Sequence, residues 1–490
     1  MIKKTLKIFL PSVLIVYLFL LIPDSEYIEL GGPVSGQFIW NRDSMWSALE
    51  NNFVEAKSAD CTKLAKPVAE AMRTAHLFLD EIEKNELQPQ DERLSRLENH
   101  IFRLTPLAGA CPEHVPDYIN LLSRLRFAVK NQSHAWDMNS TAARHTIYKL
   151  LYGSRAALEE IMLQTGPDII PSCIKGFAEP SQTPNASILG VTIHSGDILV
   201  SRGGAPTSAL IARGSDYNGN FSHAALVHVD EKTHLASIIE AHIERGAAIA
   251  SLKEYLEDKK LRVMVLRLRA DLPQLKADPM LPHKAASAAL ERTQREHIPY
   301  DFEMDFNDNS KLFCSEVVSA PYRKLGVNLW MGISTISSEG MKRWLAAFGV
   351  RHFETQEPSD LEYDPQLRVA AEWRDLETLY KDHVDNAVIE SMLERANEGR
   401  ELDYPVFMLP AARIAKLYSA ILNLFGGIGP VPEGMSAAAA LRNEKMSADH
   451  QRIKELVLAK AESFKRKNNY TAPYWRLLNF SREAIKELEY

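Results

Sequence analysis

Nucleotide-binding motifs are absent from this 490-residue sequence, which has neither a glycine-rich phosphate loop nor a dinucleotide-binding fingerprint. An excess of positive charge is also missing, since the formal net charge is −7, and this argues against a nucleic-acid-binding surface. There is no CxxC pair and no HExxH motif, so a zinc site is a weak interpretation of the four histidines in "HAALVHVDEKTHLASIIEAH". The apolar fraction of 46% and the charged fraction of 25% are those of a globular protein, here long enough for two or three domains.

The first residues carry a targeting pattern. Lys3, Lys4 and Lys7 precede an apolar run over residues 8–22, which fits poorly with a buried N-terminal helix. The run is short for a full membrane span, so a cleaved signal peptide is an alternative. We favour an uncleaved anchor over residues 1–25, because "LLIPDSEYIEL" has no small-x-small cleavage site. With its positive end inside, the anchor predicts a protein of a bacterial inner membrane whose remaining domains are exported to the periplasm.

Cysteine is scarce, with four residues in the whole chain. In an exported protein, Cys61 and Cys111 can form a disulfide between two predicted helices. Cys173 and Cys314 lie far apart in the sequence and in different contexts. If the first two cysteines pair, Cys314 is expected to remain a free thiol.

The pattern of apolar residues changes twice along the chain. Residues 41–170 show apolar positions at three- and four-residue spacing and predict a helical domain, whose charges we expect to lie on solvated faces. After a predicted linker, "PSCIKGFAEPSQTPNAS", residues 190–345 contain short β-branched runs followed by helical segments, which predicts an α+β domain. Residues 360–490 are again mainly helical in pattern.

Two of the predicted strands form the simplest kind of hairpin. "FSHAALVHV" and "LASIIEAHI" are separated by "DEKTH", so we place the turn at Glu231–Lys232. That register pairs Val229 with His234 and His223 with Glu240. Directly opposed side chains share a face, with Cβ atoms about 5 Å apart. The hairpin therefore predicts an imidazole beside a carboxylate.

A third group completes a candidate catalytic site. "KLFCSEVVSAPYRKLG" predicts a helix that starts at Cys314, although Pro321 is expected to kink or shorten it. A helix N-terminus and a nearby imidazolium both lower the pKa of a thiol. Cys314, His223 and Glu240 together provide the parts of an activated thiol nucleophile.

A structural interpretation of the same residues stays open. His223 can be a core histidine that is satisfied by Glu240, with Cys314 packed elsewhere. Tyr300 can be a core residue, and Asp301 can serve as a turn cap.

The order of five short motifs resembles the permuted branch of the NlpC/P60 papain-like superfamily, specifically the YiiX/YebB-like cysteine hydrolases. In this branch the histidine strand precedes the nucleophile, whereas ordinary NlpC/P60 enzymes have the cysteine first. The motifs that carry the resemblance are "GDILV" at 196–200, "FSHAALV" at 221–227, "IIEA" at 238–241, "PYDFEMDF" at 299–306 and "FCSEVV" at 313–318. The resemblance implies a permuted papain-like fold, with an antiparallel sheet and a nucleophile helix, flanked here by mainly α-helical regions.

The resemblance also assigns roles by position. Cys314 resembles the nucleophile, His223 the general base and Glu240 the residue that orients the base. Tyr300 resembles a tyrosine whose hydroxyl lies near the oxyanion in relatives, and Asp301 beside it is a candidate oxyanion or substrate residue. No metal or organic cofactor is implied.

Three functions follow as hypotheses. The first is an amidase or peptidase that forms a thioester with an envelope substrate, which is a peptide, a lipid or a lipoprotein. The second is a membrane-associated acyltransferase of the lecithin–retinol acyltransferase type, which passes the same thioester to another acceptor. The third is a non-catalytic envelope scaffold.

Overall fold

The computed structural model describes residues 15–23, 31–32, 36–38 and 42–488. The predicted anchor, residues 1–25, therefore lies largely outside the described residues. Among the residues that are described, no helix is long and apolar enough to cross a membrane.

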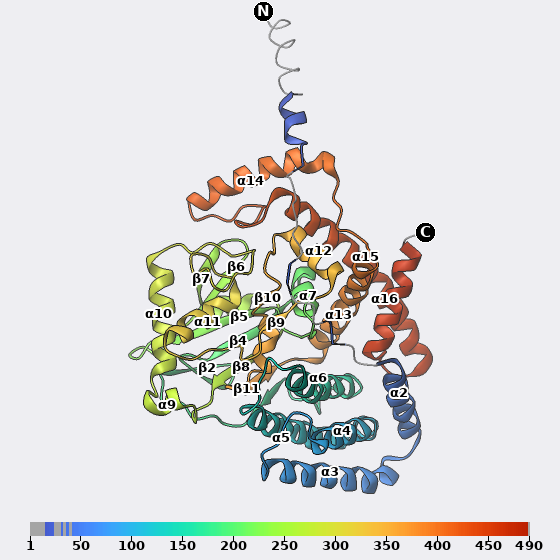
Figure 1. Cartoon of the computed structure of the whole chain (residues 1–490). Helices are drawn as coiled ribbons and strands as arrows, with labels where there is room; N and C mark the ends of the chain where they lie inside the picture. Colours follow the sequence, from blue (N-terminus) through green and yellow to red (C-terminus); the bar gives the residue numbers. More distant parts are fainter. Residues whose placement is uncertain (1–14, 24–30, 33–35, 39–41, 489–490) are drawn as a thin grey trace, which may run out of the picture.

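The N-terminal region is a layered set of helices, as its sequence pattern predicts (Figure 1). The helices are α2 (Arg42–Ser58), α3 (Cys61–Glu83), α4 (Glu92–Ala110), α5 (Val115–Ser133) and α6 (Thr141–Leu163). Asp60, Asp91 and Ser140 cap three of them, because each side chain accepts an otherwise unpaired N–H of the first turn. Cys61, at the start of α3, forms the predicted disulfide with Cys111, which follows α4, at a Cα–Cα distance of 5.6 Å.

The central element is a seven-stranded sheet in which every neighbouring pair is antiparallel, in the order β1-β11-β8-β4-β5-β6-β7. Its strands are β1 (Cys173–Lys175), β4 (Ile198–Gly203), β5 (His223–Val229), β6 (Ala236–His242), β7 (Gly246–Ser251), β8 (Lys260–Leu268) and β11 (Leu367–Trp373). Two small two-stranded sheets lie outside it, β2 (Asn185–Ile188) with β3 (Val191–His194) and β9 (Ser334–Thr335) with β10 (Glu354–Thr355).

The α+β domain extends beyond its predicted limits at both ends. Strand β1 comes from the stretch predicted to be a linker, and β11 comes from the region predicted to be mainly helical. Both lie outside residues 190–345, yet they form one edge of the same sheet. A three-residue strand leaves too short a pattern to detect, and β11 is largely buried and so lacks a clear alternation.

The predicted hairpin register is wrong by two residues. Ala225, and not His223, pairs with Glu240, and Val229 pairs with Ala236. The turn is longer than expected because the Asp230 carboxylate accepts two backbone N–H groups within it, and His234 adopts a left-handed backbone with φ of 56°. A shift of two positions keeps every side chain on its face, so His223 and Glu240 remain diagonal neighbours.

One face of the sheet is covered by α10 (Leu281–Arg295) and α11 (Cys314–Lys324), which pack against β5 and β6. Alternate strand residues such as Val200 and Leu226 join the core on this side, whereas Leu199 and Val227 join a separate core on the other side. The smaller elements are α7 (Pro206–Arg213), α8 (Leu252–Glu257), α9 (Pro273–Ala277), α12 (Glu339–Phe348), η1 (Pro112–His114), η2 (Pro358–Glu362) and η3 (Val406–Met408).

The C-terminal region is helical, and it contacts both other parts of the chain. It contains α13 (Leu376–Asn397), α14 (Leu409–Leu424), α15 (Ala437–Asn468) and α16 (Tyr474–Leu488). Helix α13 packs against α6 and β8, and α14 lies at the end of the molecule that carries the N-terminal segment (Figure 1).

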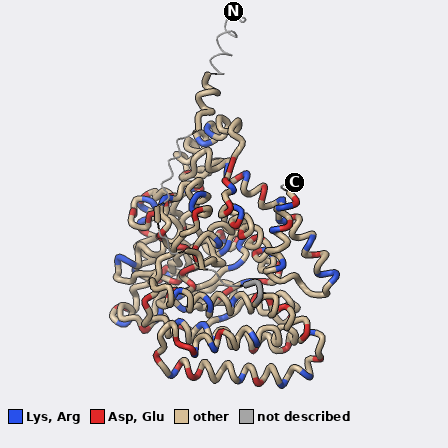
Figure 2. The backbone as a smooth tube through the Cα atoms, turned by 45° about the vertical axis from the view of Figure 1, so that its right-hand side comes forward, with Lys and Arg blue, Asp and Glu red and all other residues tan. Residues whose placement is uncertain are grey.

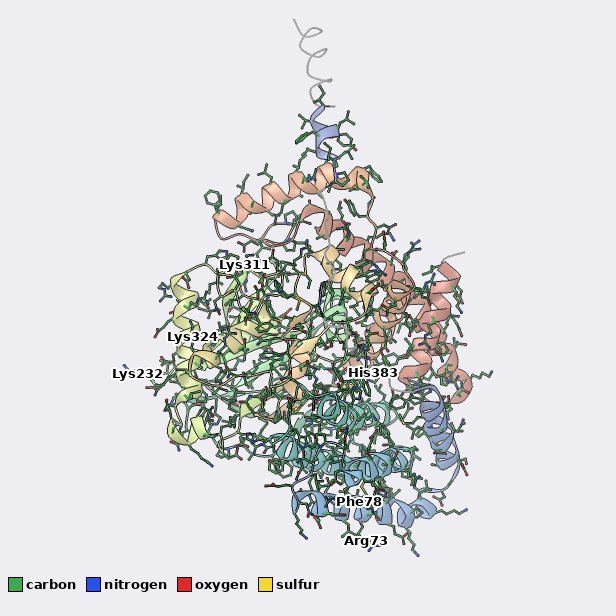
Figure 3. All side chains as sticks on the ribbon, viewed as in Figure 1. Arg73, Phe78, Lys232, Lys311, Lys324 and His383 are labelled. Carbon is green, nitrogen blue, oxygen red and sulfur yellow. A yellow bond between two sulfur atoms is a disulfide. The ribbon has the colours of Figure 1, made fainter. Side chains whose placement is uncertain are left out.

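A buried group of charges joins the three regions and overturns the expectation that the charges of the helical domain are solvated. Glu159 of α6 is 2% exposed and forms ion pairs with Arg262 of β8 and Arg374 beyond β11, at 2.7 and 2.6 Å. Its other oxygen contacts His383 of α13 at 3.1 Å (labelled in Figure 3). Arg155, one turn before Glu159, pairs with further buried carboxylates. Charges on an amphipathic helix can therefore be covered when a sheet and a second helix pack over them.

Candidate active site

The thiol of Cys314 lies at the first residue of α11. Cys314 is 5% exposed, and the helix begins there because Phe313 has an extended backbone whose N–H is accepted by the Glu316 carboxyl group at 3.1 Å. The unpaired N–H groups of the first turn place partial positive charge beside the sulfur. The helix continues through Pro321 to Lys324, so this proline does not end it.

His223 is brought to the same place by strand β5. Its Nε2 lies 2.9 Å from Oε2 of Glu240 on β6, and its ring also forms a hydrogen bond with the Cys314 thiol. The structure thus places Cys314, His223 and Glu240 in one chain of contacts.

A second histidine, which the sequence did not single out for catalysis, belongs to this group. His242 of β6 approaches Oε1 of Glu240 with Nε2 at 3.0 Å, and its ring stacks on that of His223 at 5.7 Å between centroids. It lies two residues beyond Glu240 and therefore on the same face of the sheet. That period-two spacing is the feature by which it could have been found.

The contacts shift the pKa values of all three predicted catalytic groups. Burial disfavours the charged imidazole, but hydrogen bonds to Cys314 and Glu240 outweigh it and raise the pKa of His223 to about 9. Burial likewise opposes the thiolate, but His223, the Ala224 backbone N–H and Ser315 together lower the pKa of Cys314. The pKa of Glu240 is lowered too, because its two histidine partners outweigh its burial. These shifts favour a thiolate–imidazolium pair at neutral pH, held by an ionised carboxylate.

The pair predicts a specific pH profile for alkylation by iodoacetamide. Cys314 should react rapidly below neutral pH, and the midpoint of its rate should rise in His223→Ala, because the imidazolium that stabilises the thiolate is lost. Cys173 is an internal control, since burial raises the pKa of its thiol above the ordinary value. Mass spectrometry of the labelled peptides measures both rates. Equal profiles for the two thiols would contradict an activated Cys314.

Tyr300 and Asp301 lie next to the nucleophile but have different surroundings. Tyr300 forms a parallel bridge with Leu312, two residues before Cys314, and burial together with the negative charge of Cys314 raises the pKa of its hydroxyl. The hydroxyl therefore stays protonated and can donate. The carboxylate of Asp301 instead accepts the backbone N–H groups of Glu303 and Asp305, at 3.0 and 2.8 Å. It forms the turn of this loop, as the structural interpretation of the residue expects.

A further buried carboxyl group lies close enough to Cys314 and Tyr300 to interact with their charges. Glu357 is 5% exposed, and among the described residues no hydrogen-bond partner contacts its Oε2. Its backbone is fixed, because its N–H donates to Ser334 Oγ at 2.8 Å and its carbonyl accepts Trp330 Nε1 at 2.9 Å. Burial, with the negative charges of Asp360 and Cys314, raises its pKa well above the ordinary value. Nothing local in "TQEPSDLE" distinguishes Glu357 from a surface glutamate.

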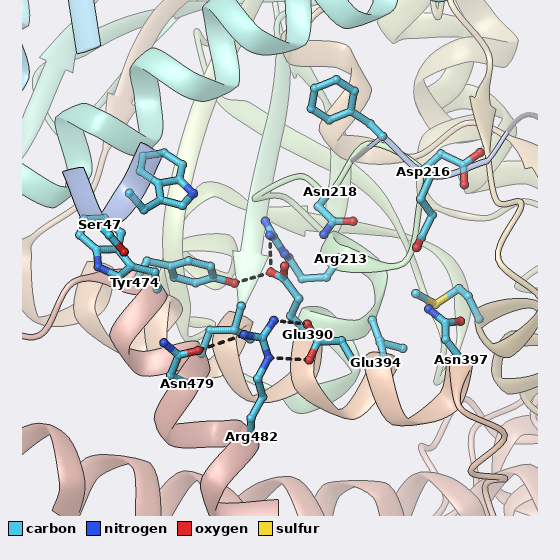
Figure 4. A pocket seen from close by; sticks show the side chains of 17 residues that line it. Ser47, Arg213, Asp216, Asn218, Glu390, Glu394, Asn397, Tyr474, Asn479 and Arg482 are labelled. Carbon is cyan, nitrogen blue, oxygen red and sulfur yellow. Dashed lines mark hydrogen bonds and ion pairs between the residues drawn. The ribbon is translucent and has the colours of Figure 1, made fainter. Parts of the chain in front are cut away.

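A separate cavity of about 560 Å³ lies between α7, α13 and α16 and contains none of the predicted catalytic residues (Figure 4). Several of its charged groups are engaged with one another. Glu390 accepts from Arg213 and Tyr474 at 2.7 and 2.6 Å, and Arg482 pairs with Glu394. In the part of the chain that the structure describes, no group of three or more His, Cys, Asp or Glu side chains is arranged to hold a metal ion.

Comparison with known proteins gives one family. Residues 192–370 match the family described as permuted papain-like amidase enzymes, YaeF/YiiX, C92 family. The match includes the cysteine, the histidine and the glutamate and extends to β11, but it covers less than half of the chain. Neither the curated proteins nor the solved structures include a match to this chain.

Proposed function

We propose that this chain, whose residues 192–370 belong to the permuted papain-like amidases, hydrolyses an amide bond at the cell envelope through a Cys314 thioester. The observation that carries the proposal is the chain of contacts from the thiol through His223 to Glu240. Compared with ordinary NlpC/P60 enzymes, the domain is permuted, because the histidine strand precedes the nucleophile helix.

The reaction starts from the thiolate–imidazolium pair. The sulfur attacks the carbonyl carbon, a C–S bond forms, and the carbonyl π electrons move to oxygen. The imidazolium of His223 gives its proton to the amide nitrogen as the C–N bond breaks, so the amine leaves and a thioester remains. His223 then takes a proton from water, which attacks the thioester. The C–S bond breaks, and the acid and the thiolate are released.

Two donors are available for the tetrahedral oxyanion. The backbone N–H of Cys314 lies in the first turn of α11, where it has no partner within the helix, and the Tyr300 hydroxyl is protonated and buried close enough for the charge of Cys314 to raise its pKa. Glu240 keeps the imidazole in the tautomer and orientation that the two proton transfers need.

Replacing Tyr300 by phenylalanine should lower kcat by about 10²-fold and leave KM nearly unchanged, since the hydroxyl acts on the transition state. Alkylation of Cys314 by iodoacetamide should keep its wild-type rate, because that reaction forms no oxyanion. Steady-state kinetics and labelling on the same preparation separate the two effects. A parallel fall in both rates would mean that Tyr300 supports the thiol and not the oxyanion.

The envelope location rests on the N-terminal sequence and on the disulfide. Lysines followed by an apolar run are typical of an anchor. A Cys61–Cys111 disulfide is typical of an exported protein, because disulfides persist in oxidising compartments. Fusions of a reporter to the C-terminus test the orientation. Activity of a reporter that works only in the cytoplasm would contradict export.

The amidase assignment is tested with an octanoyl p-nitroanilide and the full chain. Release of p-nitroaniline, together with an octanoyl mass on the Cys314 peptide after acid quenching, supports the thioester route. A lysophospholipid included in the assay distinguishes hydrolysis from transfer. Free octanoate is expected, whereas an acylated phospholipid would assign the acyltransferase function, and no turnover of any acyl probe would favour a scaffold.

A further inference from the structure

Helix α14 exposes an unusually apolar surface. Ile414, Leu417, Tyr418, Ile421 and Leu424 recur at three- and four-residue spacing, and each is between 48% and 83% exposed. The surface continues on both sides of the helix with Val406, Phe407, Met408, Phe425 and Ile428. We call these ten residues the α14 face. Contiguous exposed apolar surface of this kind marks an interaction site in a folded protein.

The opposite side of α14 is an ordinary packing surface. Leu409 and Ala412 are buried against Ala437, Ala438 and Leu441 at the start of α15. The helix is therefore held in place by the domain, and the α14 face is turned outward.

The charge on this segment has one sign. From residue 404 to residue 432 the only charged side chains are Arg413 and Lys416, and there is no carboxylate. The backbone of α14 and of the N-terminal helix is almost entirely free of acidic positions in Figure 2. An apolar helix whose only charged residues, Arg413 and Lys416, are cations suits the interface of a bilayer with anionic headgroups.

The α14 face is continuous with the N-terminal apolar segment. The Tyr17 hydroxyl donates to the Phe407 carbonyl at 3.2 Å, and Arg413 donates to the Leu20 carbonyl at 2.8 Å. Residues 15–22 expose further apolar side chains, including Phe19 at 70%. Figure 1 shows this short helix standing steeply off the end of the molecule where α14 lies across it.

We propose that α14 lies in the interface of a phospholipid bilayer, with the α14 face inserted between headgroups and acyl chains. With 16 residues, α14 is roughly 24 Å long, which suits a helix that lies on a bilayer better than one that crosses it. Residues 15–22 contact α14 and expose apolar side chains at the same end of the molecule, and this continuity favours a lipid partner over a second copy of the chain.

The segment that follows α14 leads from this surface to the active site. His297 and Glu433 form an ion pair at 2.8 Å, just before Tyr300 in the sequence. Gly434 lies so close that an added Cβ would be 2.5 Å from the Phe302 ring and 3.1 Å from the Tyr300 carbonyl. Lys311, three residues before the nucleophile, is labelled beneath α14 in Figure 3.

The position of α14 above the active site indicates the substrate class of the amidase, an inference that rests on the proposed function. A site held under a bilayer-bound helix takes its amide from a molecule carried in the membrane, namely a lipid or a lipoprotein, in preference to one free in water.

Site-specific fluorescence tests the docking without any need for catalysis. Leu417→Cys and Ile421→Cys are each labelled with bimane in the full chain carrying Cys173→Ser and Cys314→Ala, and bound to phosphatidylglycerol vesicles. Brominated lipids should quench both probes and leave a probe at Leu235→Cys unquenched, because Leu235 is 70% exposed on the β5–β6 turn, which lies away from α14 where Figure 3 labels Lys232. Vesicle-bound protein without quenching at 417 and 421 would overturn the proposal. A 417–417 disulfide dimer formed in place of quenching would assign the α14 face to a second copy.

Kinetics test the substrate class separately. Leu417→Lys combined with Ile421→Lys should lower the ratio of turnover on a vesicle-borne palmitoyl p-nitroanilide to turnover on a water-soluble acetyl p-nitroanilide. An unchanged ratio would overturn the lipid-borne substrate while the amidase stands. Failure of the wild-type chain to cleave either probe would count against the proposed amidase, and the quenching result would still decide the docking.

Discussion

Replacing Cys314 by alanine should reduce amide turnover to the uncatalysed background, a loss of roughly 10⁴-fold or more. The reason is chemical: without the sulfur, no thioester can form, and neither His223 nor Glu240 can replace it as the attacking atom. Because the site contains no other thiol, the remaining oxyanion donors would act only on direct attack by water.

The matched control is Cys173→Ala, which removes the other free thiol. Cys173 lies on the edge strand β1, partly exposed, and its loss should leave turnover unchanged. Cys314→Ser replaces only the sulfur by oxygen and keeps the shape of the side chain more closely than alanine does. It should be equally inactive, which separates chemistry from packing. If Cys314→Ala kept its wild-type turnover, the hydrolysis would have another source, and this result would support the non-catalytic scaffold.

The reaction should also respond to pH through His223. Its pKa is raised to about 9 by its two partners, so the imidazolium is present below that pH and is lost as the pH rises through it. Turnover should therefore fall above about pH 9, while alkylation of the thiolate continues to increase or stays constant. A rate of amide release that keeps rising past pH 10 would show that His223 is not the acid for the leaving amine.

The relation between His223 and Glu240 could be predicted although the register could not. A strand has a period of two residues, so an error of two positions in the hairpin leaves both side chains on the same face. The turn itself was misjudged because its geometry depends on the Asp230 carboxylate and on a left-handed His234, and neither is visible in apolar patterning.

Other parts of the site depend on contacts between distant segments. Glu357 lies near the site only because η2, which follows it, packs against the segment before β5, where Ser359 Oγ accepts the N–H of Phe221 and donates to its carbonyl. Such a glutamate looks like a surface residue until its surroundings are known. Cys314 was easier to predict, since a helix start and a neighbouring motif are both local features.

Buried charges mark the clearest limit of prediction from the sequence. The segment "SRAALEEIML" has the periodicity of an amphipathic helix, and Glu159 was expected to be solvated. In the folded chain, guanidinium groups from β8 and from the segment after β11 reach it, together with His383 of α13. Charge pairs of this kind become visible only when three regions of the chain are assembled.

Replacing Glu159 by glutamine should lower the free energy of unfolding by about 3–5 kcal/mol, the usual effect of removing one partner from a buried ion pair. Glutamine keeps the shape of the side chain and some hydrogen bonds, but it leaves Arg262 and Arg374 with one negative charge fewer in a site shielded from water. The control is Glu377→Gln, which breaks the exposed pair with Lys381 at 2.6 Å and should cost less than about 1 kcal/mol. Urea denaturation of the full chain measures both.

The pH dependence identifies the charge as the cause. Burial alone would raise the pKa of Glu159, but Arg262, His383 and Arg374 outweigh it and lower the pKa well below the ordinary value. A lowered carboxyl pKa adds stability above the pKa of the unfolded chain, about 4.3, and this stability is lost as the pH falls below it. The difference between wild type and Glu159→Gln should therefore be full at neutral pH and shrink under acid conditions. A difference that stayed constant would assign the effect to packing, and the three regions would then be joined by shape more than by charge.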